Sequence, residues 1–241
     1  MTDTRNRRPL PRVSRTTQAL VLALGLALSA LPPSTGAAAS CGGSPAPGMD
    51  WSGCVKRSKY LARANLKGGN FTRTVLERSD LTGANLTGAT LHKAQLTHTI
   101  LRDADLTGAD LRGAYGSRPY MDRVVLKGAD LSKVELSRAK LVDGDLTGAR
   151  LLGAQLARAD LTGAKLDDVV AQFANLSRAV FKGASLAGTD LTGAYLYRAR
   201  LEGADLSAAK GLTVDQLALA CGDGTTSLPA GIGAPDAWPC K

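Results

Sequence analysis

Residues 104–108 read Ala-Asp-Leu-Thr-Gly, and closely similar blocks stand at residues 84–88 (Ala-Asn-Leu-Thr-Gly) and 204–206 (Ala-Asp-Leu). Extending this register gives a centre at every fifth position from Leu61 to Leu206, or (206 − 61)/5 + 1 = 30 positions, of which 25 are Leu. A small residue, most often Ala, stands two positions before each centre. Because a period of five fits neither a helix nor a strand, the segment is one repeat architecture that returns the same residue types to its interior.

These blocks resemble the A-(D/N)-L-x-x consensus of the pentapeptide-repeat family over residues 60–209, which are 150 of the 241 residues. The resemblance implies an all-β fold, a right-handed quadrilateral β-helix in which four pentapeptides make one coil. The central Leu and the preceding small residue then face inward. Thirty centres make 30/4, or about 7.5 coils, and the rod would be roughly 35 Å long at the spacing of β-strands.

The N-terminal residues 1–39 are typical of a signal peptide. Five Arg residues precede an apolar run from Ala19 to Leu31, and three Ala residues at 37–39 form a small-residue cleavage site. We therefore expect a secreted protein, or one of the periplasm or cell envelope. Contact with a membrane is expected only if this segment is not cleaved or if Cys41 is lipidated. The remaining chain holds 25 basic and 20 acidic residues, a net charge of 25 − 20 = +5.

Four cysteines flank the repeats, and an even count in an exported chain indicates disulfides. Cys41 and Cys54 precede the repeats, whereas Cys221 and Cys240 follow them. In the rod that the resemblance implies, the two ends lie too far apart for a disulfide to join them. We therefore expect the pairs Cys41–Cys54 and Cys221–Cys240.

The two flanks are expected to cap the bare ends of the repeat. Residues 40–59 would form an N-terminal cap, and residues 210–241 a C-terminal cap. Within the second, Thr213 and Gln216 match a capping box, which predicts a short helix at about residues 214–220.

One outward column contains mostly Arg. Reading every twentieth residue, two positions after the centres of one expected face, gives Arg78, His98, Arg118, Arg138, Arg158, Arg178 and Arg198. The equivalent column of the neighbouring face is Gly68, Gly88, Gly108, Gly128, Gly148, Asp168 and Gly188. A period of 20 residues is therefore visible in the sequence, as four-sided coils require.

We interpret the Arg column as a stripe that binds an anionic polymer. Tyr115, Tyr195 and Tyr197 are expected on the same face, and aromatic rings beside guanidinium groups suit sugars or other ring-bearing polymers. The alternative is that Arg is a soluble residue tolerated at a turn, with Glu77 and Glu135 as local partners, and that the tyrosines are scattered over the surface.

Two centres lack a large side chain. At Gly116 the small position is occupied by Pro119, with Tyr115 alongside, and Ala171 lies beside Phe173. Each interruption is expected to be a bend or bulge with a nearby side chain folded inward, or else an exposed aromatic patch for a partner.

The chain shows no motif of catalysis, phosphate binding or zinc binding, so no enzyme activity, metal or cofactor is expected. We predict a non-catalytic structural or interaction rod outside the cytoplasm, whose partner is an anionic polymer or an unknown protein. Nucleic acid is not expected, because the charge is modest and the chain carries an export signal. Self-association is left open. The alternative is a DNA mimic that binds gyrase, like the fluoroquinolone-resistance members of the family, although the export signal and basic charge disfavour it.

Overall fold

The computed structural model describes residues 41–239, all within one compact unit, Ala37–Lys241. The expected signal peptide at residues 1–39 and the thiol of Cys240 lie outside the described residues. None of the helices in the described part is long and apolar enough to cross a membrane.

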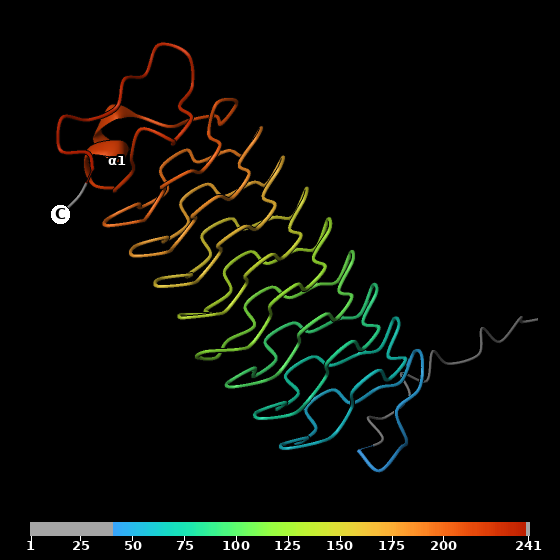
Figure 1. The fold of residues 1–241 in the computed structure, drawn as a ribbon. Coiled ribbons are helices and arrows are strands. Elements are labelled where there is room, and N and C mark those ends of the chain that lie inside the picture. The colour runs from blue at the N-terminus through green and yellow to red at the C-terminus, as the bar shows by residue number, and fades with distance from the viewer. Residues whose placement is uncertain (1–40, 240–241) are drawn as a thin grey trace, which may run out of the picture. The chain divides into compact units, whose positions relative to one another are not determined.

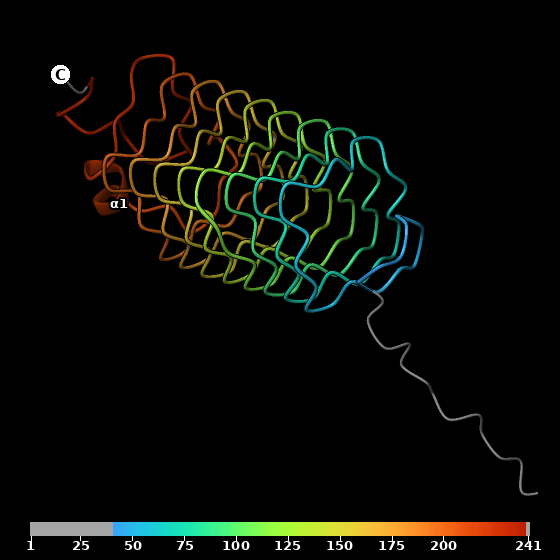
Figure 2. The ribbon, with the colours of Figure 1, turned by 90° about the horizontal axis from the view of Figure 1, so that it is seen from below.

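The described chain forms coils of 20 residues, each stacked on the next (Figures 1 and 2). Asp105 forms parallel bridges with Asn85 in the preceding coil and Val125 in the following coil. Its N–H donates to the Ala84 carbonyl at 3.0 Å, and the N–H of Leu106 donates to the Val125 carbonyl at 2.7 Å. A bridge residue recurs at every fifth position from Asp50 to Lys210 and pairs with a residue 20 positions away, so each coil has four sides.

Pairing within residues 41–239 consists of isolated parallel bridges rather than multi-residue strands. The reason is that each five-residue side also contains a turn. The N–H of Ala109 closes one such turn by donating to the Leu106 carbonyl at 3.0 Å. Only one residue per side is left in a bridge, so the expected all-β structure is present as a ladder of short bridges.

The third residue of each turn has a left-handed backbone conformation. Positive φ recurs at every fifth position from Gly48 to Gly203 and takes values near 65° at Gly and near 55° at other residues. Glycine suits this position because it has no Cβ to clash with the following carbonyl. This requirement explains the many Gly residues two positions after the centres.

The interior consists of the centres and the small residues that precede them. Leu106 and Ala104, for example, have no exposed surface. Where a hydroxyl replaces Ala, it is buried but satisfied. Thr99 Oγ1 donates to the Leu76 carbonyl at 2.9 Å, and Thr74 Oγ1 donates to the Trp51 carbonyl at 2.7 Å.

The coil geometry begins before Leu61. Gly48, Gly53 and Ser58 already have positive φ, and Trp51 and Lys56 occupy the positions of the centres. Both side chains are buried, with exposed fractions of 2% and 7%. The segment that was expected to be a cap therefore forms the first coil of the stack.

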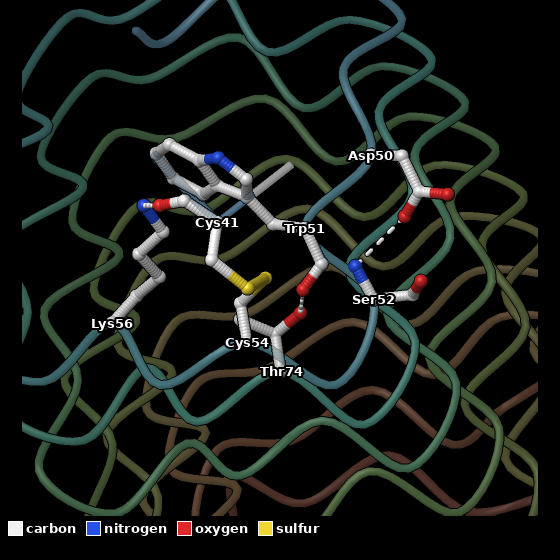
Figure 3. Close-up of a disulfide and its surroundings, with 7 residues drawn as sticks. All are labelled: Cys41, Asp50, Trp51, Ser52, Cys54, Lys56 and Thr74. Atoms are coloured by element: carbon white, nitrogen blue, oxygen red, sulfur yellow. Dashed lines mark hydrogen bonds between the residues drawn. A yellow bond between two sulfur atoms is a disulfide. The ribbon is translucent and has the colours of Figure 1, made fainter. Parts of the chain in front are cut away.

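A disulfide joins Cys41 to Cys54, with their Cα atoms 5.5 Å apart, at this N-terminal end (Figure 3). It places the Cys41 carbonyl where it accepts a hydrogen bond from Lys56 Nζ. The same ammonium lies 3.8 Å from the centroid of the Trp51 ring. Burial of the ammonium, together with the nearby Lys59, lowers the pKa of Lys56.

The helix α1, Val214–Ala218, follows the last repeats near the C-terminal end (Figure 1). Its capping box pairs Thr213 with Gln216. Gln216 Nε2 also donates to the carbonyls of Leu191 and Ala194, at 2.9 and 2.8 Å, which ties α1 to the last coils. Beyond α1, Trp238 Nε1 donates to the Ala220 carbonyl at 2.9 Å. The pair Cys221–Cys240 remains a prediction, because Cys240 is outside the described residues.

Neither interruption folds its flanking aromatic side chain inward. Tyr115 is 44% exposed beside Gly116, and Phe173 is 64% exposed beside the buried Ala171. At Gly116 the backbone itself moves in. An added Cβ would lie 2.5 Å from Thr97 N and 2.7 Å from the Leu96 carbonyl carbon. The expected inward side chain is therefore replaced by a close approach of two backbones, which only Gly allows.

Candidate anion-binding face

The predicted Arg column forms a straight ladder on one face of the stack. We call Arg78, Arg118, Arg138, Arg158, Arg178 and Arg198 the Arg ladder. Each lies at a turn position with φ between 53° and 61°. His98, which completes the column, has φ of 54°. Because the coils follow one another at the spacing of paired strands, successive guanidinium groups start from backbones about 4.7–4.9 Å apart.

Most of the Arg ladder has no partner among residues 41–239. The side chains of Arg78, Arg118, Arg138, Arg158 and Arg178 make no hydrogen bond, ion pair or ring contact there. The partners expected from the sequence are not used, since Glu77 pairs instead with Arg57 at 3.0 Å. Glu135 forms no ion pair with any described residue.

Some cations on other faces do have carboxylate partners. Arg123 pairs with Asp103 at 2.7 Å, and Lys127 pairs with Asp145 at 3.1 Å. The Asp103 partner raises the pKa of Arg123, while the same hydrogen bond lowers the pKa of Asp103. Within the described residues the Arg ladder lacks such carboxylate partners, and so do Arg73, Lys93 and Lys133 on another face. What distinguishes the ladder is that six of the seven positions in its column are Arg.

The Gly-rich column, expected on the neighbouring face, lies ten residues or two of the four sides away and is therefore on the opposite face. It provides a reference with the same backbone. We call Gly68, Gly88, Gly108, Gly128, Gly148 and Gly188 the Gly column; their φ values lie between 61° and 70°. An added Cβ at Gly108, Gly128 or Gly148 would meet no atom within 4 Å. Space therefore does not explain why one column is Arg and the other Gly.

The structure brings together only part of the predicted tyrosine set. Tyr195 and Tyr197 stack with ring centroids 6.1 Å apart, and the guanidinium of Arg198 lies 5.5 Å from the Tyr197 centroid. Tyr115 is on the same face but four coils away, which is roughly 19 Å at the strand spacing. The predicted residues thus form an aromatic cluster at one end and a separate tyrosine further along.

Two hollows on this side were not expected from the sequence. One, of about 390 Å³, lies over Gly116 and is lined by Tyr115, Ser117, Glu135, Ser137, Gln155 and Ala157. The other, of about 770 Å³, lies where the last coil meets the segment that follows it and involves Tyr197, Arg198, Arg200, Glu202 and Leu219. Each combines a tyrosine and a carboxylate and adjoins the Arg ladder.

The second hollow has one unsatisfied group nearby. Glu202 Oε1 accepts a hydrogen bond from Arg200 Nε at 3.0 Å, whereas Glu202 Oε2 is buried without a partner. The sequence signal for this hollow was weak, because its walls come from segments about 20 residues apart and from the cap.

The face of the Gly column has a different chemistry. Asp105 Oδ1 accepts hydrogen bonds from the N–H and hydroxyl of Thr107, at 2.9 and 2.6 Å. Burial raises the pKa of Asp105, but the bonds from Thr107 and Thr87 outweigh it and hold the pKa below its usual value. Burial also raises the pKa of Asp145, but hydrogen bonds from Thr147 and Lys127 outweigh it and lower the pKa. These aspartates therefore brace turns, as local side-chain to backbone bonds do elsewhere.

The described residues contain no group of three or more His, Cys, Asp or Glu side chains arranged to hold a metal ion.

Comparison with protein families places this architecture. The profile described as "Pentapeptide repeats" matches eight copies, over residues 60–94, 91–115, 119–148, 135–170 and 174–210. The chain belongs to the pentapeptide-repeat family, whose members are typically structural or interaction proteins rather than enzymes. The matches break at residues 116–118 and 171–173, which are the two interruptions.

Solved structures with a similar chain include other pentapeptide-repeat proteins. HetL, involved in heterocyst differentiation regulation in the cyanobacterium Nostoc sp. strain PCC 7120, is 26% identical, with 79% of this chain and 94% of HetL covered and a TM-score of 0.40. QnrB1, a plasmid-mediated fluoroquinolone resistance protein, is 15% identical, with 70% and 92% covered and a TM-score of 0.42.

A third similar structure is a pentapeptide-repeat protein of the Arabidopsis thaliana thylakoid lumen. It is 22% identical, with 58% of this chain and 82% of that chain covered and a TM-score of 0.31. No curated protein matches this chain. These likenesses assign no function to it.

Proposed function

We propose that this pentapeptide-repeat protein is a non-catalytic interaction rod that acts outside the cytoplasm and binds an anionic polymer along the Arg ladder. The finer fold proposed with it is a right-handed coil of about 7.5 turns over the repeat register, closed by α1 as a capping helix.

One observation carries the proposal. Five of the six guanidinium groups of the Arg ladder have no partner among residues 41–239, although they start from a backbone conformation that favours Gly. A left-handed conformation costs a non-Gly residue about 1–2 kcal/mol, and aligned like charges repel one another. A bound polyanion would offset the repulsion by supplying the missing counter-charges.

The location outside the cytoplasm is supported by two features. The first 39 residues have the composition of a signal peptide, and Cys41 is joined to Cys54. Structural disulfides persist in oxidising compartments, so both features favour an exported protein.

The proposal is tested by replacing Arg138, Arg158 and Arg178 with Gln together. We expect unchanged folding, weaker binding to heparin and a shallower salt dependence of that binding, because fewer counterions are released when fewer guanidinium groups contact the polymer. Binding would be measured by titration calorimetry at low and at physiological salt.

A matched control replaces Arg73, Lys93 and Lys133 with Gln. These residues also have positive φ, at 55–57°, and form one column on another face. The control removes the same charge, so an equal loss of affinity in both triple variants would show that net charge alone drives binding and would contradict the proposal.

The gyrase-binding alternative stays open and is separated by the same variants. It expects the protein to inhibit purified DNA gyrase, with no requirement for the Arg ladder. Inhibition that persists in the Arg138, Arg158 and Arg178 variant would favour the alternative.

A further inference from the structure

The hollow over Gly116 is held open by the backbone. A side chain at residue 116 would collide with Leu96 and Thr97, so no substitution can fill the missing centre without displacing the preceding coil. Pro119 has no N–H, and so this turn lacks the closing bond that Ala139 makes to the Leu136 carbonyl at 3.2 Å in the next coil. The interruption thus replaces an interior Leu with a surface depression.

The groups around the depression are available to a ligand. Tyr115 is 44% exposed and contacts no other ring in the described part of the chain. The hydroxyls of Ser117 and Ser137 make no hydrogen bond with described residues, and Glu135 makes no ion pair there. Gln155 is held in place, because its Oε1 accepts from Asn175 Nδ2 at 3.1 Å and its Nε2 donates to the Gly153 carbonyl at 3.2 Å.

The Arg ladder runs directly beside this depression. Arg118 and Arg138 follow Ser117 and Ser137 in the chain, so two unpaired cations border a site that also contains a carboxylate and an aromatic ring. The volume, about 390 Å³, lies at the lower end of the range for small-ligand pockets, about 300–1,000 Å³. The site therefore suits one ring of a larger molecule.

We propose that this hollow binds a single sugar ring of an acidic polysaccharide, whose anionic groups lie along Arg118, Arg138 and Arg158. This inference rests on the proposed function and names its ligand class. The apolar face of the sugar packs on Tyr115, sugar hydroxyls donate to the Glu135 carboxylate, and the two serine hydroxyls complete the polar contacts.

Glu135 decides between a polysaccharide and a polymer of phosphates. A phosphate chain has no hydroxyl donors and would be repelled by a carboxylate in the middle of the site. A sugar acid has hydroxyl groups that can donate hydrogen bonds to the Glu135 carboxylate. It also has anionic groups that Arg118 and Arg138 can bind.

The test compares oligogalacturonate with polyphosphate of equal charge, by titration calorimetry on the oxidised protein. Tyr115→Ala is expected to weaken oligogalacturonate binding about tenfold, as loss of a central aromatic contact does, and to leave polyphosphate binding within about twofold. Glu135→Gln is expected to weaken oligogalacturonate binding and to strengthen polyphosphate binding, because it removes an acceptor and a repulsive charge together.

Tyr60→Ala serves as the control, because Tyr60 is 82% exposed at the N-terminal end and off this face. Equal circular dichroism spectra and melting temperatures would establish that the variants fold. If both polymers bind and the Tyr115 and Glu135 variants alter them alike, the sugar site is wrong while the anion-binding function stands. If neither polymer binds the wild-type protein, both proposals are overturned.

Discussion

The Arg ladder and the Gly column have the same backbone conformation, but one column has long cationic side chains and the other has none. Arg138 and Gly148 have φ of 58° and 67°, each two positions after a buried centre. Room for a side chain exists at both, since an added Cβ at Gly148 would meet nothing within 4 Å. The comparison teaches that the coil geometry permits Gly or Arg at this position, so the choice between them concerns the surface of the molecule rather than its fold.

The two faces also differ at the residue that directly precedes each buried centre. On the face of the Gly column, Asn85, Asp105 and Asp145 accept hydrogen bonds from the following Thr residues. On the face of the Arg ladder, only Asn175 makes the equivalent bond within the described residues, to the Ser177 N–H at 3.1 Å. One face therefore stabilises its own turns, whereas the other leaves its polar groups available.

The largest expected effect removes the core that both faces share. Leu146 is fully buried two positions before Gly148. Leu146→Asp should destabilise the protein by roughly 4 kcal/mol or more, because it places an unpaired charge in the interior. Gly148→Asp is the control, since Asp168 is tolerated in the same column. Urea denaturation of both variants would measure the difference, and similar midpoints would contradict the assignment of the core.

The second prediction converts the Gly column into a copy of the Arg ladder. Replacing Gly108, Gly128 and Gly148 with Arg should change stability by less than about 0.5 kcal/mol per site, because the strain of a side chain at positive φ and the lower freedom of the unfolded chain nearly cancel, and should create a second cationic stripe. Heparin titration would report the number of chains bound per protein. A large loss of stability, well beyond this expected change, would show that the two columns are not geometrically equivalent.

The third prediction concerns the stability of the fold at acid pH. Hydrogen bonds lower the folded-state pKa of Asp105 and Asp145 below the unfolded value of 3.8. Their contribution to stability is therefore present above this value and is lost as the pH falls through the lower folded-state pKa. These carboxylates protonate below about pH 4, and we expect the urea concentration at the unfolding midpoint to decrease in that range.

Asparagine at the same positions sharpens this test. Asn85 makes the same two bonds from Thr87, at 3.0 and 2.7 Å, without titrating. The double change Asp105→Asn and Asp145→Asn should therefore flatten the acid dependence and keep the turns intact. An unchanged pH profile would mean that other groups control acid unfolding.

The smallest expected effect is Arg138→Gly. The substitution relieves the left-handed Arg but adds freedom to the unfolded chain, and these terms of about 1 kcal/mol nearly cancel. The free energy of unfolding, measured with urea, should change by less than about 0.5 kcal/mol. Binding to heparin should decrease. A clear loss of stability would show that the Arg side chain supports the fold.

Much of the architecture could be predicted from the repeat register, as could the Cys41–Cys54 disulfide and a short helix after Thr213, but the point where the coils begin could not. Trp51 and Lys56 occupy centre positions although neither resembles Leu, so a register read from Leu alone starts at Leu61. The spacing of Gly48 and Gly53 contained the missing signal, because both are turn residues with positive φ.

The predicted site was only partly recoverable from sequence. The columns follow from counting in twenties, so Arg118 and Arg138 could be placed on one face. Whether they pair with Glu77 or Glu135 depends on side-chain directions across coils, and the structure directs Glu77 to Arg57 instead. The hollow was also beyond reach, because the loss of a Leu at residue 116 permits either an inward side chain or an inward backbone.

The sequence by itself determined the period, the interior and the outward columns, because a strict five-residue register returns the same residue types to the same side. The tertiary structure decided which polar groups are satisfied and where the surface is open, because these depend on contacts between residues about twenty positions apart and on the backbone approach at Gly116. For this protein the fold is thus a property of local repetition, whereas the candidate binding face arises only when the coils are stacked.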